Sequence, residues 1–189
     1  IALGLGDLVD AVGHDRIVFG GRGALDIAVD ADRAAMHNPF DAGGLSPFEH
    51  ISHRLRELAF LNKGIEIQVL DQRIDEKVVY RFDGGVTEFV SYLNEGRTVL
   101  HPEPIYLQGE KEGVSVELAM QYNDAYQETI FTYANNIKTS EGGTHLVGFR
   151  SALTRSINAY TSRNSLNKNV KFSISGEDTR EGLSAVVSV

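Results

Sequence analysis

Cysteine is absent from the 189 residues of this chain. Its absence excludes disulfide bonds, thiolate zinc sites and a cysteine nucleophile, and it is compatible with a reducing compartment. Long apolar runs are absent as well, since none approaches the roughly 20 residues that a membrane-spanning helix needs. The first residues also lack the basic-then-apolar order of a signal peptide. We therefore expect a cytoplasmic protein that makes no membrane contact.

Positive charge is scarce. The chain has 18 Lys and Arg against 26 Asp and Glu, a formal net charge of −8, whereas free-standing nucleic-acid-binding proteins usually carry a basic excess that neutralises phosphates. Any DNA contact must therefore be local. Only residues 138–171 have a clear cationic bias, with Glu141 as the one acidic residue. A solvated helix face and a wall facing nucleic acid both explain this bias. The basic residues there are Lys138, Arg150, Arg155, Arg163, Lys168 and Lys171.

Motifs for nucleotide binding and nucleophilic catalysis are missing too. The glycine cluster at residues 20–23 (GGRG) lacks both the dinucleotide-binding spacing and the lysine of a P-loop, so it predicts a turn. Neither His101 nor His145 lies in a recognisable nucleophile motif. The simplest role of His145, which follows Thr144 at a predicted helix start, is to satisfy or pack against that terminus. We predict no catalytic residue.

Two groups of side chains have some features of a metal site. His50 and His53 lie three residues apart on one helical face, but no third ligand is near them in the sequence, which favours exposed helix histidines. The acidic residues of the 176–182 stretch (GEDTREG) could form a divalent-cation site. Arg180 among them favours local ion pairing or capping instead. We therefore predict no metal site.

Signals for regular structure sharpen after residue 46. Ser46, Pro47 and Glu49 form a capping-box signature with proline at the first helical position. A helix should begin there and end near the glycine of residues 62–64. Alternation and spacing of apolar residues also predict short strands at 16–19 and 24–30, a hairpin over 65–82 and a helix over 86–94.

The clearest strands lie at residues 105–108, 114–122 and 127–135, separated by turn-like segments. We expect them to pair as an antiparallel meander, with a last strand over 183–189. A helix at 145–160 is the natural cover for one face. The fold class is therefore α+β, an antiparallel or mixed sheet covered by helices on one face. The wetter face of the middle strand should carry Ser115, Glu117, Ala119 and Gln121.

A strand, a glycine-containing loop and a helix follow one another in residues 135–160. Gly142 and Gly143 free the backbone for torsions that other residues resist, and two adjacent glycines between rigid elements allow a hinge. Thr144 can cap the helix start. Asn135 and Asn136 are expected to terminate the strand. Helical spacing predicts an inward face formed by Leu146, Phe149, Leu153, Ile157 and Tyr160.

Five segments carry a family resemblance: residues 54–64 (RLRELAFLNKG), 101–104 (HPEP), 121–124 (QYND), 135–160 and 176–182. Together they closely resemble the B subunit of bacterial DNA gyrase. The resemblance runs in order from about Pro47 to Val189, and residues 1–46 are not matched. It covers the part of that subunit called the transducer, which follows the ATP-binding domain. The B-type subunit of topoisomerase IV is a close relative, but residues 148–150 (GFR) and 153–155 (LTR) are more similar to the gyrase version.

The resemblance implies a transducer fold similar to the second domain of ribosomal protein S5, with an unusual left-handed crossover. It implies that the chain is part of an ATP-dependent topoisomerase that negatively supercoils DNA. The transducer relays nucleotide-driven closure to the DNA gate and helps to wall the cavity through which a duplex passes. The residues expected to face that duplex, attracting phosphate without reading bases, are Arg150, Arg155, Lys168 and Lys171, with Lys138 behind them.

By the same resemblance, ATP and Mg belong to the whole enzyme. The ATP-site motifs cannot be placed in residues 1–46, so we expect this chain neither to bind ATP well nor to hydrolyse it. The implied partners are a DNA duplex bound weakly through its backbone, the gyrase A subunit and a second B subunit. We expect residues 1–46 to be a separate or divergent segment and 47–189 to be the transducer domain. The alternative is a protein-interaction domain for which DNA contact is incidental.

Overall fold

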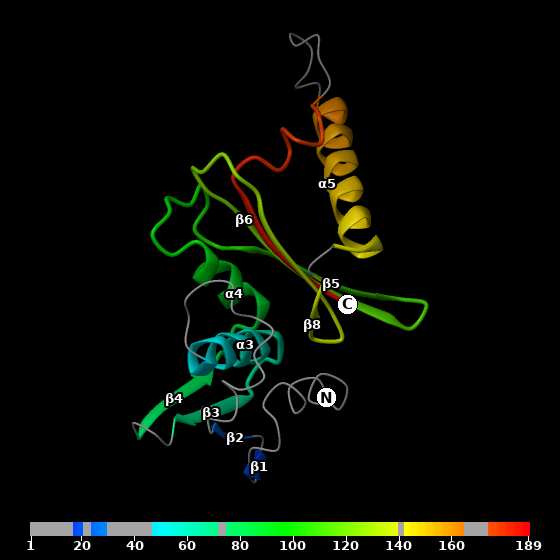
Figure 1. The fold of residues 1–189 in the computed structure, drawn as a ribbon. Helices are drawn as coiled ribbons and strands as arrows, with labels where there is room; N and C mark the ends of the chain where they lie inside the picture. Colours follow the sequence, from blue (N-terminus) through cyan, green and yellow to red (C-terminus); the bar gives the residue numbers. More distant parts are fainter. Residues whose placement is uncertain (1–16, 21–23, 30–46, 72–74, 140–141, 165–173) are drawn as a thin grey trace. The chain divides into compact units, whose positions relative to one another are not determined.

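A computed structural model describes residues 17–20, 24–29, 47–71, 75–139, 142–164 and 174–189 (Figure 1). The chain forms two compact units, residues 1–89 and residues 90–189, so the division falls within helix α4 (Val86–Leu93). The two units are described separately below. The two units divide after residue 89, whereas the sequence predicts a domain boundary after residue 46. The boundary after residue 46 stays a prediction.

The first unit contains a four-stranded sheet in the order β1–β2–β3–β4. Strand β2 (Ala24–Val29) pairs antiparallel with β1 (Ile17–Gly20) and parallel with β3 (Glu66–Asp71). The parallel pairing requires a crossover, which helix α3 (Pro47–Leu61) supplies. Strand β4 (Glu76–Arg81) closes the predicted hairpin with β3.

Helix α3 forms the core of the first unit with this sheet. It begins at Pro47 as predicted, while Ser46, its predicted N-cap, lies outside the described residues. Near the C-terminal end of the helix, the Phe60 ring stacks on those of Phe82 and Phe89, with centroid distances of 3.6 and 4.7 Å. The buried core residues shared by the helix and the sheet are Phe48, Leu55, Ala59, Ile67, Val69 and Tyr80.

The second unit contains a five-stranded mixed sheet in the order β5–β6–β9–β7–β8. Strands β5 (Ile105–Lys111) and β6 (Val114–Tyr122) pair antiparallel, as the first two strands of the predicted meander should. The predicted meander is wrong, because β9 (Leu183–Ser188) lies between β6 and β7 (Thr129–Ala134), antiparallel to the first and parallel to the second. The short strand β8 (Ile137–Lys138) completes the sheet beside β7. Alternation shows which residues share a face, but it does not show which strands are neighbours.

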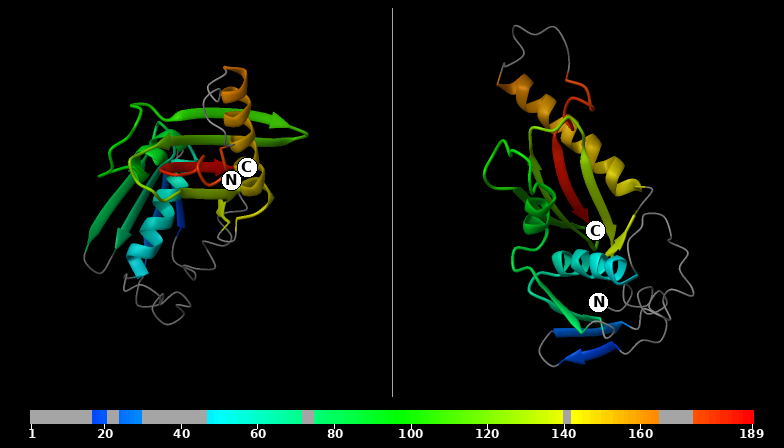
Figure 2. Two further views of the ribbon diagram at one scale, coloured as in Figure 1. Left: turned by 90° about the horizontal axis from the view of Figure 1, so that it is seen from above. Right: turned by 60° about the vertical axis from the view of Figure 1, so that its left-hand side comes forward.

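Helix α5 (Thr144–Arg163) connects β7 to β9 and covers one face of this sheet, as Figures 1 and 2 show. Its buried Leu153 packs with Leu183 and Ala185 of β9, so the predicted role of the helix as a cover is confirmed. Full burial of a leucine side chain is worth roughly 1.5–3 kcal/mol, so Leu153 and Leu183 contribute most to holding the helix on the sheet. The partly buried members of this cluster are Met120, Tyr122, Ile130, Phe149 and Ile157.

The opposite face of the second sheet is covered at the C-terminal half of β6, which corrects part of the prediction of a wetter side; of the four residues expected there, Ser115 is exposed and Glu117 is half-buried. Ala119 and Gln121 of β6 are buried, and all five residues from Leu183 to Val187 of β9 are buried. Asn94, which follows α4, donates a hydrogen bond to the Gln121 side chain across this face. A buried amide is tolerated when its polar atoms are paired, so polarity alone did not identify a solvent-exposed face.

The C-terminal end of α5 differs from the prediction. Tyr160 was expected to point inward, but it is 63% exposed. The C-terminal end of α5 extends past the strands of the second sheet (Figure 1). Neither α5 nor any other helix in the described ranges combines the length and the hydropathy that crossing a membrane requires.

Candidate nucleic-acid interface

The loop before α5 requires glycine at two positions. Gly142 and Gly143 have φ angles of +86° and +115°, and a Cβ atom on either would lie 2.9 Å from a side chain, that of Leu146 or His145. The N-cap of α5 is Gly143 and no side chain caps the helix, so the prediction that Thr144 caps it is wrong. The geometry explains the pair of glycines, whereas hinge motion at this joint stays a prediction.

The turn that positions Lys138 is formed by two asparagines. Asn135 and Asn136 have φ angles of +49° and +68°, which asparagine tolerates better than most residues, and they join β7 to β8. Lys138 on β8 thereby places its ammonium nitrogen 4.1 Å from the centroid of the Phe131 ring on β7. This is the geometry of a cation–π contact, so the lysine charge is fixed close to the sheet.

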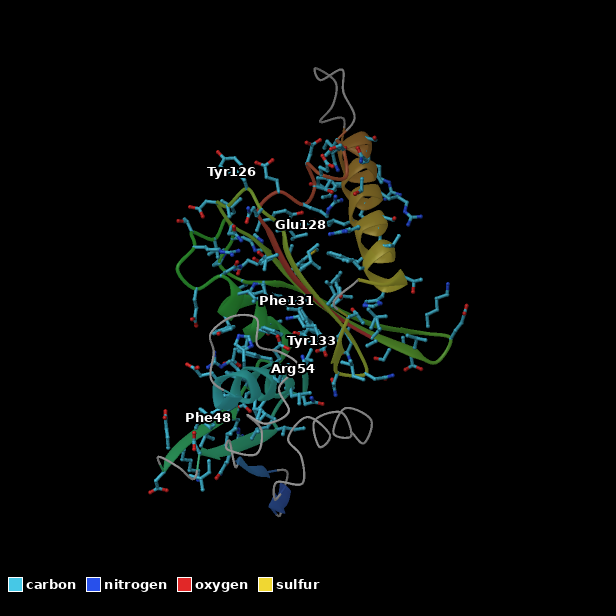
Figure 3. The ribbon with its side chains drawn as sticks, in the orientation of Figure 1. Phe48, Arg54, Tyr126, Glu128, Phe131 and Tyr133 are labelled. Atoms are coloured by element: carbon cyan, nitrogen blue, oxygen red, sulfur yellow. The ribbon has the colours of Figure 1, made fainter. Side chains whose placement is uncertain are left out.

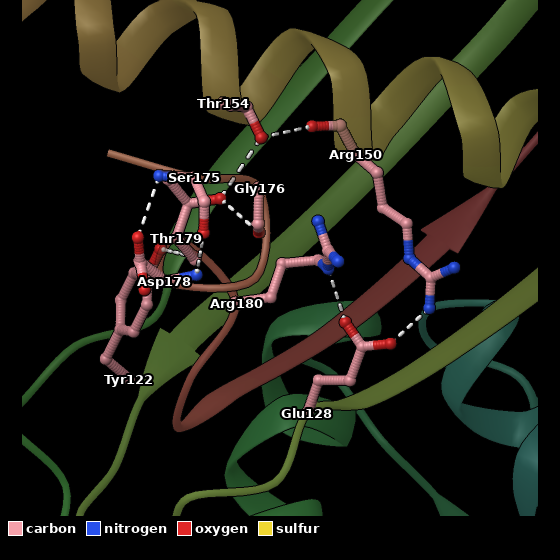
Figure 4. A network of polar contacts seen from close by, with 9 residues as sticks. All are labelled: Tyr122, Glu128, Arg150, Thr154, Ser175, Gly176, Asp178, Thr179 and Arg180. Carbon is pink, nitrogen blue, oxygen red and sulfur yellow. Dashed lines mark hydrogen bonds and ion pairs between the residues drawn. The ribbon is translucent and has the colours of Figure 1, made fainter. Parts of the chain in front are cut away.

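Arg150 on α5 is one of two arginines that share a single carboxylate (Figure 4). Its Nη2 donates to Oε1 of Glu128, and Nε of Arg180 donates to Oε2 of the same residue over 2.7 Å. Glu128 lies just before β7, next to the exposed Tyr126 turn that Figure 3 labels. The cluster therefore ties together three segments that are distant in the sequence.

The loop that carries Arg180 is held by its own polar contacts. The Ser175 amide donates to Oδ2 of Asp178 over 2.8 Å, and the Asp178 amide donates to the Ser175 hydroxyl. Thr179 connects this loop to α5, because its hydroxyl lies 3.1 Å from that of Thr154. Its carbonyl also accepts a hydrogen bond from the Tyr122 hydroxyl of β6 over 2.7 Å. These contacts fix the backbone that presents Arg180.

Hydrogen bonds from the Ser175 side chain and backbone lower the pKa of Asp178 below its ordinary value. A lowered folded-state pKa gives a stability contribution that is present above the ordinary aspartate pKa and is lost as pH falls through the folded value. We predict that Ser175→Ala raises the Asp178 pKa, measured by NMR titration of its carboxyl carbon. Ser151→Ala, on the exposed side of α5, should not change it. An unchanged Asp178 pKa in Ser175→Ala would contradict the assignment.

Of the three predicted DNA-facing residues that the structure describes, it brings Arg150 alone into this cluster. Arg155 is exposed on α5, and its separation of five residues from Arg150 corresponds to roughly 140° around the helix, so the two project from different sides. Lys138 lies on β8. The other two, Lys168 and Lys171, fall outside the described residues.

The sequence did not identify the partners of this cluster. Arg180 was expected to pair with acidic neighbours in its own loop, but its carboxylate partner, Glu128, lies 52 residues earlier. Local spacing carries no signal for a contact at that separation, which depends on the insertion of β9 beside β7.

Comparison with known proteins gives a consistent result. A model of the DNA gyrase B family matches residues 85–189. The gyrase B protein of Myxococcus xanthus is 54% identical over 142 residues, which is 75% of this chain and 17% of that protein. The gyrase B protein of Clostridium acetobutylicum is 54% identical over 143 residues, 75% of this chain and 22% of that protein. The chain thus spans about a fifth of the length of these curated relatives.

Two solved structures extend the comparison to the fold. The 43K ATPase domain of Thermus thermophilus gyrase B, solved with an aminocoumarin, matches with a TM-score of 0.68 and 38% identity over 80% of this chain and 42% of that one. The B-subunit of the Myxococcus xanthus gyrase matches with a TM-score of 0.66 and 26% identity over 79% of this chain and 41% of that one. The α+β fold expected from the sequence is confirmed, and the chain belongs to the DNA gyrase B family.

Proposed function

We propose that this chain is the transducer part of a DNA gyrase B subunit, which couples ATP binding and hydrolysis to strand passage and negative supercoiling. The observation that carries the proposal is the family match over residues 85–189, which contains the whole second unit. ATP and Mg belong to the whole enzyme, and its partners are the gyrase A subunit and a second B subunit. The proposed location of the protein is the cytoplasm. In this role Gly142 and Gly143 form the hinge through which α5 moves relative to the sheet.

The proposed DNA-facing surface consists of the cationic side chains of α5 and its neighbours. The helix contains Arg150, Arg155 and Arg163 and no acidic residue. Lys138 lies on β8, the strand that precedes α5 in the chain. Lys168 and Lys171 lie outside the described residues and are included in the proposed surface because of their place in the sequence. Such side chains attract backbone phosphate at any base sequence, as passage of an arbitrary duplex requires.

Titration of a labelled duplex tests this surface. We predict weak binding at low salt that fades steeply at moderate salt. Arg155→Gln should weaken the binding and reduce the slope of log K against log salt by about 0.9, because one phosphate contact is lost. The matched control is Lys111→Gln, which removes the same charge from the exposed β5–β6 hairpin. Equal weakening by both substitutions would contradict a localised surface.

One observation favours the second candidate, a protein-interaction domain without direct DNA contact. Arg150 is already paired with Glu128, so another side chain of the same protein neutralises part of the cationic charge. Exposed apolar side chains occur in the same unit, with Leu100 68% and Tyr126 85% exposed. The titration separates the two candidates, because absence of duplex binding even at low salt would favour the mechanical role.

A further inference from the structure

The shared carboxylate of Glu128 is the starting point of the inference. Three separate segments meet there: the residue before β7, helix α5 through Arg150, and the loop before β9 through Arg180. The side chain of Glu128 is 33% exposed, that of Arg150 37% and that of Arg180 18%. The cluster is therefore at the surface, and solvent or a ligand reaches its charged ends.

The chemistry of the cluster is that of an anion site. Guanidinium groups bind carboxylate and phosphate oxygens through the same charge-assisted hydrogen bonds. Two arginines and one glutamate leave one net positive charge, and Nε of Arg150 is buried with no hydrogen-bond partner in the described part of the chain. Glu128 thus holds the two arginines together without satisfying every donor of Arg150.

We propose that Glu128 occupies the position of a DNA backbone phosphate between Arg150 and Arg180, so that a duplex binds there only by displacing the carboxylate. The inference rests on the proposed function and assigns a further contact, Arg180, and its internal competitor.

Partly exposed ion pairs contribute little to stability, so an external phosphate can compete with the carboxylate for the same guanidinium groups. After displacement Glu128 still carries its negative charge and repels the bound phosphate. The glutamate therefore keeps the contact weak and short-lived, which suits a surface that a duplex must pass.

Glu128→Gln tests the inference because it keeps the shape of the side chain and removes its charge. We expect duplex binding, measured by fluorescence anisotropy at low salt, to become roughly tenfold tighter. The slope of log K against log salt should steepen by about 0.9–1.8, corresponding to one or two more phosphate contacts. Glu110→Gln near the tip of the β5–β6 hairpin removes the same charge elsewhere and should change affinity less than twofold. Adding Arg180→Gln to Glu128→Gln should abolish most of the gain.

The outcomes separate the two proposals. If the unmodified chain binds duplex with the expected salt dependence and Glu128→Gln binds no more tightly than Glu110→Gln, the competitor role is overturned and the DNA-facing surface stands. If neither the unmodified chain nor Glu128→Gln binds at low salt, both proposals fall. Circular dichroism checks folding, and Glu128→Ala is the second variant, which should shift affinity in the same direction.

Discussion

Gly182→Ala is expected to lower the free energy of unfolding by about 4 kcal/mol. A Cβ atom at this position would lie 2.4 Å from the carbonyl oxygen of Asn123 and 2.8 Å from that of Ala125. Both contacts are with backbone, which cannot rotate away as a side chain can. Gly182 also has a φ of +68° and accepts a hydrogen bond from the Asn123 amide over 2.8 Å. The methyl group would therefore separate β9 from the turn that follows β6.

Gly96→Ala is the matched control for this prediction. Gly96 has a φ of +79°, but a Cβ atom there would meet no atom within 4 Å. Its substitution carries only the backbone strain of a left-handed alanine, about 1 kcal/mol. The difference between the two variants, measured by urea denaturation followed by far-UV circular dichroism, isolates the close approach at Gly182. Equal losses in both variants would show that strain alone decides the result.

Local periodicity predicted the helices well. Helix α5 was expected over residues 145–160 and extends over Thr144–Arg163, and α4 was expected over 86–94 and extends over Val86–Leu93. Apolar residues at helical spacing have only one face to bury, and glycine marks the places where the helices begin or end. Such signals lie within a few residues of the structure that they specify.

Strand order and the site cluster could not be predicted in the same way. The insertion of β9 between β6 and β7 depends on a crossover through α5, and no residue in β6 or β7 encodes it locally. Glu128 was not identified because its role exists only after that crossover brings Arg180 beside it. The cationic bias of α5 was visible in the sequence, whereas the internal carboxylate that balances part of it was not.

Polar residues are buried on the face of the second sheet opposite α5, and the cause of their burial is a set of hydrogen bonds that the sequence did not reveal. The side-chain amide of Asn94 donates to Oε1 of Gln121 over 2.8 Å, and its own Oδ1 accepts from Nδ2 of the Asn123 side chain over 3.0 Å and from the Ser184 hydroxyl over 2.6 Å. All four side chains are buried. The four side chains pair with one another, so Gln121, which alternation places on the wetter face, belongs to a connected network inside the unit.

Asn94→Ala should therefore lower the free energy of unfolding by about 3 kcal/mol. The substitution removes the hydrogen bonds that Asn94 makes with the buried side chains of Gln121, Asn123 and Ser184. Ser184→Ala should cost about 1.5 kcal/mol, because it removes one member and leaves fewer groups unpaired. The double variant should lose less than the sum by about 1 kcal/mol, because the two side chains share a bond. Asn164→Ala, an exposed asparagine at the end of α5 that donates to the Tyr160 carbonyl, is the control and should cost under about 1 kcal/mol. Additive losses for Asn94 and Ser184 in urea denaturation would show that the network is not coupled, and the burial of Gln121 would then rest on packing alone.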